Sequence, residues 1–196
     1  VRGSFRRSTQ LEKDFAAADQ NGEYIITPMA REALRRLAEG IGTSSTFRAW
    51  TLTGPYGVGK SAFAVFLTML FCEAGKQSRM ARSQLEQVDP LLSVHLRHLG
   101  LFKKDSKGFL PVLATARRTS AFKCIAEGIV SAASLVRDQK VKASVHSLGD
   151  TLRSQPNGQP WDTRQIIDAI SFLSKAATAS GYQGILLVID ELGKLF

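Results

Sequence analysis

The sequence has little cysteine and no long hydrophobic segment. Its 196 residues include two cysteines, Cys72 and Cys124, which lie far apart and form no CxxC pair. This excludes a small disulfide-stapled protein and favours two buried thiols in a reducing compartment, with a regulatory disulfide as the less favoured alternative. The longest apolar run, Ala62 to Cys72, contains Thr68 and is shorter than the roughly 20 residues of a membrane-spanning helix. We therefore expect no membrane span and no membrane partner.

The start of the chain, VRGSFRRSTQ, lacks the apolar core of a secretory signal peptide. A cytoplasmic location is therefore expected. Residues 1–22 are polar and charged, and they are predicted to form a weakly structured lead-in. The lead-in has no initiating Met, and its first residues, Val1 to Ser4, are consistent with residues left from cloning.

Composition and charge narrow the class of protein. Hydrophobic residues make up 44% and charged residues 22% of the chain, which is ordinary for a protein that buries a core and excludes wholesale disorder. The formal net charge of +9 would suit a nucleic-acid partner, because clustered Lys and Arg neutralise phosphates. The basic residues form only small groups, however, so a basic solvated surface is an equally good interpretation.

Short apolar runs alternate along the chain with segments of helical periodicity. The predicted strands are residues 49–53, 109–114 and 185–189. The predicted helices begin at or near Pro28, Lys60, Lys76, Ser120 and Asp162. Asp89-Pro90 is predicted to break the helical segment 76–100, and residues 138–160, with Gly149 and two prolines, are predicted to be mostly loop.

The last apolar run, Ile185 to Ile189, contains no polar residue. An uninterrupted strand of this kind is typical of a parallel sheet that is covered by helices on both faces. Together with the alternation of strands and helices, it predicts a three-layer α/β fold with a mostly parallel sheet.

The segment Gly54-Pro55-Tyr56-Gly57-Val58-Gly59-Lys60-Ser61 fits the pattern G-x-x-x-x-G-K-[ST] between a predicted strand and a predicted helix. Glycines let the backbone wrap closely, so that successive N–H groups point at phosphate oxygens. The helix that begins at Lys60 adds its N-terminal dipole and free N–H groups, which include that of Ala62. Lys60 is placed to reach the β- and γ-phosphates, and the Ser61 hydroxyl to bind Mg²⁺.

A second motif is Ile185-Leu186-Leu187-Val188-Ile189-Asp190-Glu191. The strand brings its final acid to the carboxyl edge of the sheet, where ligands of open α/β sheets bind. Asp190 is expected to hold the Mg²⁺ that Ser61 binds, directly or through water. Glu191 is expected to polarise the water that attacks the γ-phosphate, as a general base.

The two motifs resemble the Walker A and Walker B elements of P-loop NTPases. The Asp190-Glu191 pair resembles the branch with an added catalytic Glu, and the lead-in Tyr24 to Pro28 is similar to the N-terminal linker of AAA+ and STAND ATPases. Both motifs also look like those of large bacterial ATPases of antiphage defence systems. The resemblance implies a P-loop ATPase domain over 23–196, with a helical insertion around 76–108.

The resemblance further implies an ATP-binding and ATP-hydrolysing module that requires Mg²⁺, with Lys60 and Glu191 as its catalytic residues. Adenine is expected to be the preferred base, with Tyr24 or Ile25 as an apolar wall. The module would couple its nucleotide state to a partner domain or to nucleic acid, and it could form a homo-oligomer. Two alternatives stay open, namely a module that binds ATP or ADP with negligible hydrolysis and a P-loop small-molecule kinase.

The sequence stops at Phe196, directly after the second motif. Later strands, a sensor residue and an arginine finger are not in it, so the domain is expected to be incomplete at its C-terminus and to belong to a longer protein. The sequence contains two weaker features as well. His95 and His98 could share a metal, but a solvated or partly buried pair is favoured. Arg117-Arg118 could contact phosphate or nucleic acid, but a surface role is favoured.

Overall fold

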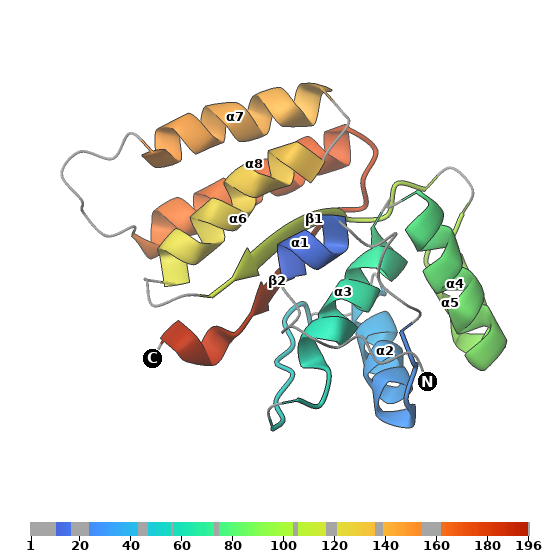
Figure 1. Cartoon of the computed structure of the whole chain (residues 1–196). Coiled ribbons are helices and arrows are strands. Elements are labelled where there is room, and N and C mark those ends of the chain that lie inside the picture. The colour runs from blue at the N-terminus through green and yellow to red at the C-terminus, as the bar shows by residue number, and fades with distance from the viewer. Residues whose placement is uncertain are drawn as a thin grey trace.

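The computed structural model describes residues 11–16, 24–42, 47–55, 57–72, 75–103, 106–116, 121–135, 139–153 and 162–195 (Figure 1). Within these residues the chain is mostly helical, with one small parallel sheet. The elements in chain order are α1 (Leu11–Ala16), α2 (Pro28–Ile41), α3 (Lys60–Phe71), α4 (Lys76–Val88), α5 (Pro90–His98), β1 (Leu110–Thr115), α6 (Ala121–Leu135), α7 (Gln139–Arg153), α8 (Thr163–Ala179), β2 (Ile185–Asp190) and a 3₁₀ helix (Leu192–Leu195). The fold is therefore of the α/β class.

The two strands pair in parallel, from Leu110 opposite Ile185 to Thr115 opposite Asp190. Parallel pairing needs a long crossover, and α6, α7 and α8 provide it. Both carboxyl ends consequently meet at one edge of the sheet. Thr115 and Asp190 lie side by side there, and the backbone continues the pairing beyond them, because Ala116 N donates to Asp190 O at 2.8 Å.

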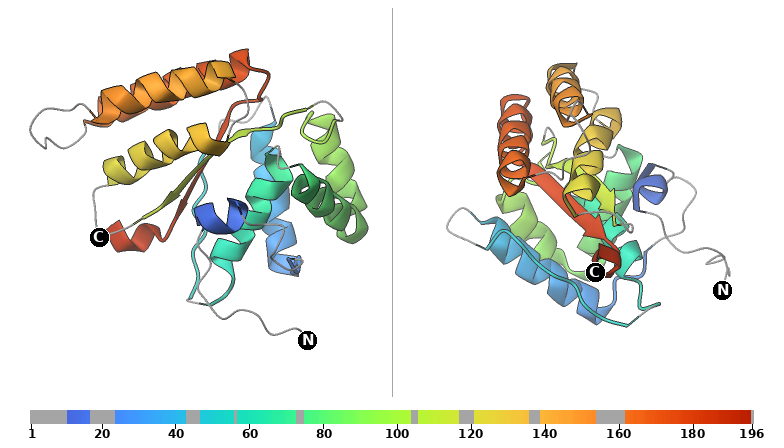
Figure 2. Two further views of the ribbon diagram at one scale, coloured as in Figure 1. Left: turned by 45° about the horizontal axis from the view of Figure 1, so that its top comes forward. Right: turned by 90° about the vertical axis from the view of Figure 1, so that its left-hand side faces the viewer.

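Helices pack against both faces of the strand pair, as Figure 2 shows. On one face, Leu110 and Val112 of β1 and Leu187 of β2 join the core formed with α6, α7 and α8. On the other face, Leu113 and Val188 pack against α1 and α3. This division follows from the alternation of side chains along a strand, and it brings α1 and α3 to the face that carries Thr115 and Asp190.

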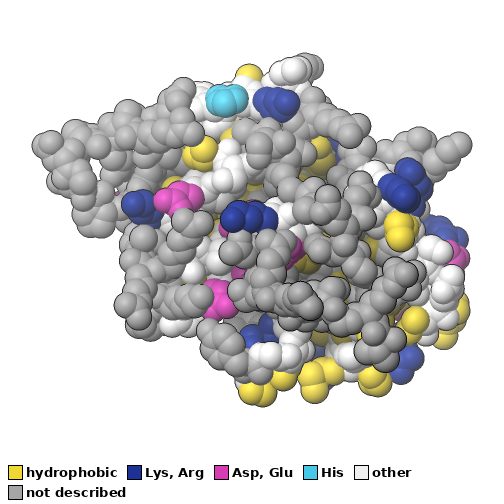
Figure 3. All heavy atoms as spheres, viewed as in Figure 1, with side chains coloured by type: hydrophobic (Ala, Val, Ile, Leu, Met, Phe, Trp, Pro, Cys, Tyr) yellow, Lys and Arg dark blue, Asp and Glu magenta, His cyan; other side chains and the backbone are white. Residues whose placement is uncertain are grey.

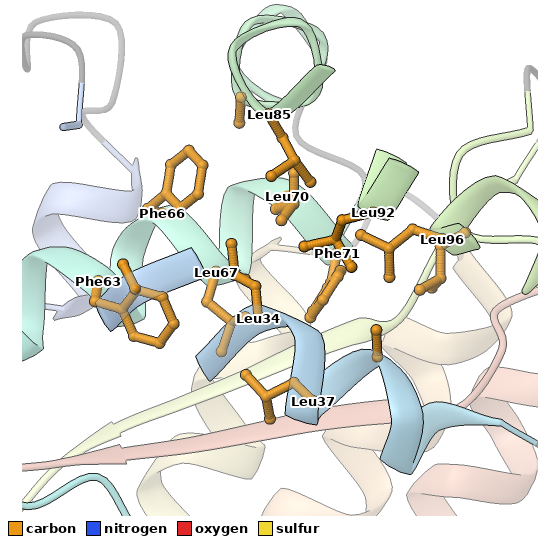
Figure 4. Close-up of a cluster of buried hydrophobic side chains, with 14 residues drawn as sticks. Leu34, Leu37, Phe63, Phe66, Leu67, Leu70, Phe71, Leu85, Leu92 and Leu96 are labelled. Atoms are coloured by element: carbon orange, nitrogen blue, oxygen red, sulfur yellow. The ribbon is translucent and has the colours of Figure 1, made fainter. Parts of the chain in front are cut away.

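A second core lies between α2, α3, α4 and α5 (Figure 4). Thr27 caps α2 by accepting a hydrogen bond from Ala30 N at 3.2 Å, and Pro28 occupies the first turn, as the sequence predicts. The core itself is formed by large side chains that α3 shares with its neighbours. They include Leu34, Leu37, Phe63, Phe66, Leu67, Leu70, Phe71, Leu85, Leu92 and Leu96.

Asp89 is a buried charged residue, 4% exposed, that connects the helices around this core. Its side chain caps α5 by accepting from Leu92 N at 3.1 Å, and it also accepts from Arg35 of α2 at 2.8 and 3.2 Å. The break predicted at Asp89-Pro90 is confirmed. The same carboxylate that ends α4 therefore ties the α4–α5 pair to α2.

The prediction of a strand over 49–53 is not confirmed, because this segment is extended but belongs to no strand. Its side chains are exposed, with Trp50 at 42% and Leu52 at 48%. An extended segment becomes a strand only when its N–H and C=O groups pair with a neighbour, and among the described residues none pairs with this one. The segment lies instead against the end of α2, where Arg48 donates to Gly40 O.

Two further expectations need correction. Residues 138–160 were expected to be mostly loop, but Gln139–Arg153 form α7. The helix tolerates Gly149 because it passes close to α6 there, where a Cβ would lie 3.2 Å from Val130 Cγ2. The lead-in 1–22 was expected to be weakly structured, but it contains α1, which Leu11 anchors against α3 and β1.

The burial predicted for the last strand also differs. β2 was expected to be buried on both faces, but each of its residues is half-buried, whereas β1 is almost fully buried. The prediction of two buried thiols, by contrast, is confirmed, because Cys72 and Cys124 are both buried and do not form a disulfide. None of the described helices is both long and apolar enough to cross a membrane.

Candidate nucleotide site

The loop before α3 has the backbone that a phosphate-binding loop requires. Gly57 and Gly59 have φ values of 82° and 86°, a left-handed conformation that glycine adopts without strain. A Cβ at either position would meet no atom within 4 Å among the neighbours of the loop, so the glycines serve conformation rather than close packing. Tyr56 lies outside the described residues, so its role stays a prediction. Lys60 begins α3, and Phe63 N donates to Gly59 O at 2.8 Å, the first bond of the helix.

The Lys60 side chain folds back over this loop. Its Nζ donates to Gly54 O at 2.9 Å and to Pro55 O at 2.8 Å. The ammonium group is thereby held over the backbone that precedes the helix, and it adds its charge to the positive end of the α3 dipole. The site thus presents a lysine charge and a helix N-terminus together, which is a favourable combination for an anion.

The orientation of α3 places its start at the carboxyl edge of the sheet. At the far end of α3, Phe109 N donates to Phe71 O at 2.9 Å, so the helix ends where β1 begins. The helix has 12 residues and the strand six, so both are about 18–20 Å long. Midway, Ala64 and Val65 pack with Val188. Figures 1 and 2 show the start of α3 at the same end of the molecule as the strand tips.

Asp190 has a carboxylate oxygen that can bind a ligand at this edge. Its Oδ1 accepts from Glu191 N at 2.8 Å, but Oδ2 is buried and has no hydrogen-bond partner among the described residues. A buried carboxylate oxygen without a partner is costly, and a bound cation or its water would satisfy it. Glu191 has a φ of 58°, which is rare for a residue with a Cβ and costs about 1–3 kcal/mol of strain.

The oxygen donors at this edge fit Mg²⁺. Within the described part of the chain, no three His, Cys, Asp or Glu side chains form a metal-binding group. Mg²⁺, however, is usually held by one or two carboxylates together with phosphate oxygens and water. The Ser61 hydroxyl in the first turn of α3 and the Asp190 carboxylate are donors of this kind, and the unpartnered Oδ2 agrees with the assignment.

The structure adds two residues that the sequence motifs do not contain. Thr115, at the end of β1, donates from Oγ1 to Glu12 Oε2 of α1 at 2.7 Å. Thr115 is the register partner of Asp190, so this hydrogen bond lies at the candidate site. The only sequence signal was the position of Thr115 just past a predicted strand, and Glu12 lay in a segment expected to be a lead-in.

Of the two residues expected to contact the adenine base, Tyr24 and Ile25, Tyr24 is already packed against other rings. The Tyr24 ring stacks on Phe66 at a centroid distance of 4.7 Å and is tilted against Phe63 at 6.3 Å. Burial raises the pKa of the Tyr24 hydroxyl above its ordinary value of 10.0. Ile25, which is 79% exposed, is the more accessible of the two candidates. Tyr24 therefore positions this segment beside α3, and Ile25 remains open to a ligand.

The histidine pair does not join this site. His95 and His98 are exposed in the last turn of α5, and Arg117-Arg118 lies outside the described residues. On the face that Figure 3 shows, the described Lys and Arg side chains are scattered rather than gathered into one patch. The distribution of charge on this face therefore does not support the prediction of a nucleic-acid partner.

Comparison of the chain with models of protein families, with curated proteins and with solved structures found no match.

Proposed function

We propose that this chain binds ATP with Mg²⁺ at the loop Gly54–Ser61 and hydrolyses it. The observation that carries the proposal is the position of this loop. It precedes the N-terminus of α3, at the sheet edge where Asp190 has a buried oxygen without a partner among the described residues. The motif supplies the groups that bind phosphate, and the strand end supplies the acids.

The phosphates would be bound by backbone N–H groups from Gly57 to Ala62, since the α3 N-terminus leaves such groups unsatisfied within the helix. Lys60 would release Gly54 O and Pro55 O and reach the β- and γ-phosphates instead. Exchange of two neutral acceptors for charged phosphate oxygens favours the bound arrangement, because the ammonium group is attracted more strongly to a negative charge than to a carbonyl dipole.

Ser61 and Asp190 would hold Mg²⁺, which neutralises charge on the phosphates. Glu191 would accept a proton from the attacking water, because a carboxylate next to the metal ligand is suited to this general-base task. The strained φ of Glu191 supports a functional role, since strain of this kind gathers at active sites. The module would belong to a larger AAA+- or STAND-like ATPase that couples its nucleotide state to a partner domain.

The binding proposal is tested by thermal shift with MgATP and MgADP. We expect a rise in unfolding free energy of about 2.7 kcal/mol at a hundredfold excess of nucleotide over Kd. Lys60→Ala should abolish the shift, whereas Lys76→Ala should retain it. Lys76 is the matched control because it also begins a helix behind a glycine, but its side chain is exposed and follows the far end of α3, where β1 begins. An equal shift in both variants would refute the proposed site.

The hydrolysis proposal is tested by phosphate release. Glu191→Gln should keep nucleotide affinity and lose roughly 10²–10⁴-fold in rate, because the amide cannot accept the proton. Asp190→Ala should weaken binding of MgATP more than binding of metal-free ATP. The control is Asp168→Asn, which changes an exposed acid on α8. Binding without measurable turnover in the parent protein would instead favour the nucleotide-binding module.

The preference for adenine is tested by competition between ATP and GTP. No Asn-Lys-x-Asp segment, which reads guanine, is present in the sequence. Exposed Ile25 would provide an apolar contact for the base, and Ile25→Asp should therefore weaken ATP binding roughly fivefold through loss of apolar burial. Equal competition by the two nucleotides would contradict the preference.

A further inference from the structure

A side-chain hydrogen bond between Thr115 and Glu12 joins α1 to the carboxyl edge of the sheet. The Thr115 Oγ1 to Glu12 Oε2 distance of 2.7 Å is that of a strong O–H···O⁻ hydrogen bond. α1 itself is fixed by Leu11, which is fully buried against Ala64, Val65 and Leu113. The packing of α1 thus holds Glu12 at the site.

Thr115 and Asp190 face the same side of the sheet. They are register partners in a parallel pair, in which neighbouring strands lie about 4.8 Å apart. Leu113 and Val188, each two residues earlier, pack together on the α1 and α3 face, and residues two apart point the same way. The Thr115 hydroxyl therefore lies next to the Asp190 carboxylate, on the face where α3 begins with Lys60.

The bond to Glu12 fixes what the Thr115 hydroxyl can do. A hydroxyl has one proton to donate and two lone pairs that accept, and Thr115 donates its proton in the hydrogen bond to Glu12. Thr115 can then only accept toward its other neighbours. Asp190 Oδ2 is also only an acceptor while ionised, and it has no partner among the described residues. The Thr115 hydroxyl and Asp190 Oδ2 are thus two acceptors on adjacent strands, and a donor between them would satisfy both. A water molecule bound to Mg²⁺ is such a donor, because its oxygen faces the metal and both of its protons point away from it.

We propose that Thr115, oriented by Glu12, is a further positioning residue of the Mg²⁺ site. Its oxygen accepts a hydrogen bond from a metal-bound water that Asp190 also binds. The inference rests on the proposed function, because it needs Mg²⁺ and a nucleotide at this edge. It assigns α1 a role in setting how strongly nucleotide binding depends on Mg²⁺.

The test measures the Mg²⁺ concentration that gives half of the ATP-induced thermal shift, together with ATP affinity in EDTA. Thr115→Val should raise that concentration roughly fivefold, the effect of one lost hydrogen bond, and leave metal-free affinity unchanged. Thr115→Ser should restore it. Thr178→Val is the matched control, since that hydroxyl bonds to Ser174 O at 3.0 Å on the exposed surface of α8.

Glu12→Gln gives an independent variant that keeps the side-chain volume. Its amide can donate to Thr115 as well as accept, so it should raise the Mg²⁺ requirement to an intermediate value. This variant decides the question if Thr115→Val does not fold. An unchanged Mg²⁺ requirement in both variants would overturn the inference and leave nucleotide binding standing. A parent protein that shows no Lys60-dependent shift with MgATP would overturn the proposed function, and this inference with it.

Discussion

Two apolar segments of this chain, residues 49–53 and β1, have similar sequences but different secondary structure and burial. Both consist of short β-favouring runs, Ala-Trp-Thr-Leu-Thr and Leu-Pro-Val-Leu-Ala-Thr. β1 pairs with β2 and is almost fully buried, even though Pro111 lies inside it. Residues 49–53 are extended, exposed and, among the described residues, unpaired. Local preference therefore did not decide which run became a strand.

The difference lies in what surrounds each segment. β1 has β2 on one edge and helices over both faces, so the backbone groups on that edge are paired and its side chains are removed from water. Residues 49–53 have α2 beside them, and a helix offers no row of backbone partners. β-propensity is mainly a measure of fit to a paired and half-buried surface, which only the first segment has.

The largest effect is expected where the buried segment begins. Gly108 has a φ of 60°, and a Cβ there would lie 2.1 Å from Phe71 O. Gly108→Ala should cost more than about 3 kcal/mol in unfolding free energy, because strain and a backbone clash add. Gly181→Ala is the control, since its φ is 86° but a Cβ would meet nothing within 4 Å. Urea unfolding of the two variants measures the contrast, and equal losses would contradict it.

The contrast between the two segments is measured directly by truncating one leucine in each. Leu113 is 2% exposed in β1, and Leu52 is 48% exposed in the unpaired segment. Leu113→Ala should cost about 2–5 kcal/mol and Leu52→Ala less than about 0.5 kcal/mol. Chemical denaturation gives both values. A comparable loss at Leu52 would mean that residues 49–53 are covered in solution.

A smaller effect is expected from breaking the close approach between Trp50 of the exposed segment and Gly40 of α2. A Cβ on Gly40 would lie 2.0 Å from the Trp50 ring, so Gly40→Ala should displace the ring at a cost of about 1 kcal/mol. Trp50 fluorescence, recorded in a Trp161→Phe background, should shift to the red. Gly42→Ala should leave it unchanged, because a Cβ at Gly42 would come no closer than 3.4 Å to its neighbours.

The smallest effect concerns the thiol beside the start of β1. Cys72 is fully buried and bridges to Gly108 and Phe109, and burial raises the pKa of its thiol above the ordinary value of 9.0. Above pH 9 the unfolded chain loses this proton while the folded chain keeps it, so stability falls as pH rises. The loss should be about 0.4 kcal/mol at pH 9. Cys72→Ser should remove this part of the pH dependence, and an identical pH slope in both proteins would contradict it.

Much of the architecture could be predicted because its signals are local. Thr27-Pro28 marks the start of α2, and Asp162 with Gln165 forms the capping box predicted for α8. The strand ends that carry Thr115 and Asp190 follow from apolar runs. Glu12, in contrast, meets Thr115 across 103 residues and leaves no local pattern. The α7 helix was missed because Gly149 resembles a breaker until its contact with α6 is known.

The pairing of β1 with β2 also sets the order in which this chain can fold. Leu110 meets Ile185, so the first backbone bond of the sheet closes a loop of roughly 75 residues. Helices α6, α7 and α8 lie inside that loop and can form from near neighbours, whereas the strands must wait for distant segments to meet. Formation of the sheet should therefore limit the folding rate. Until then the run Ile185–Ile189 is open to other chains, and dilute conditions should favour refolding.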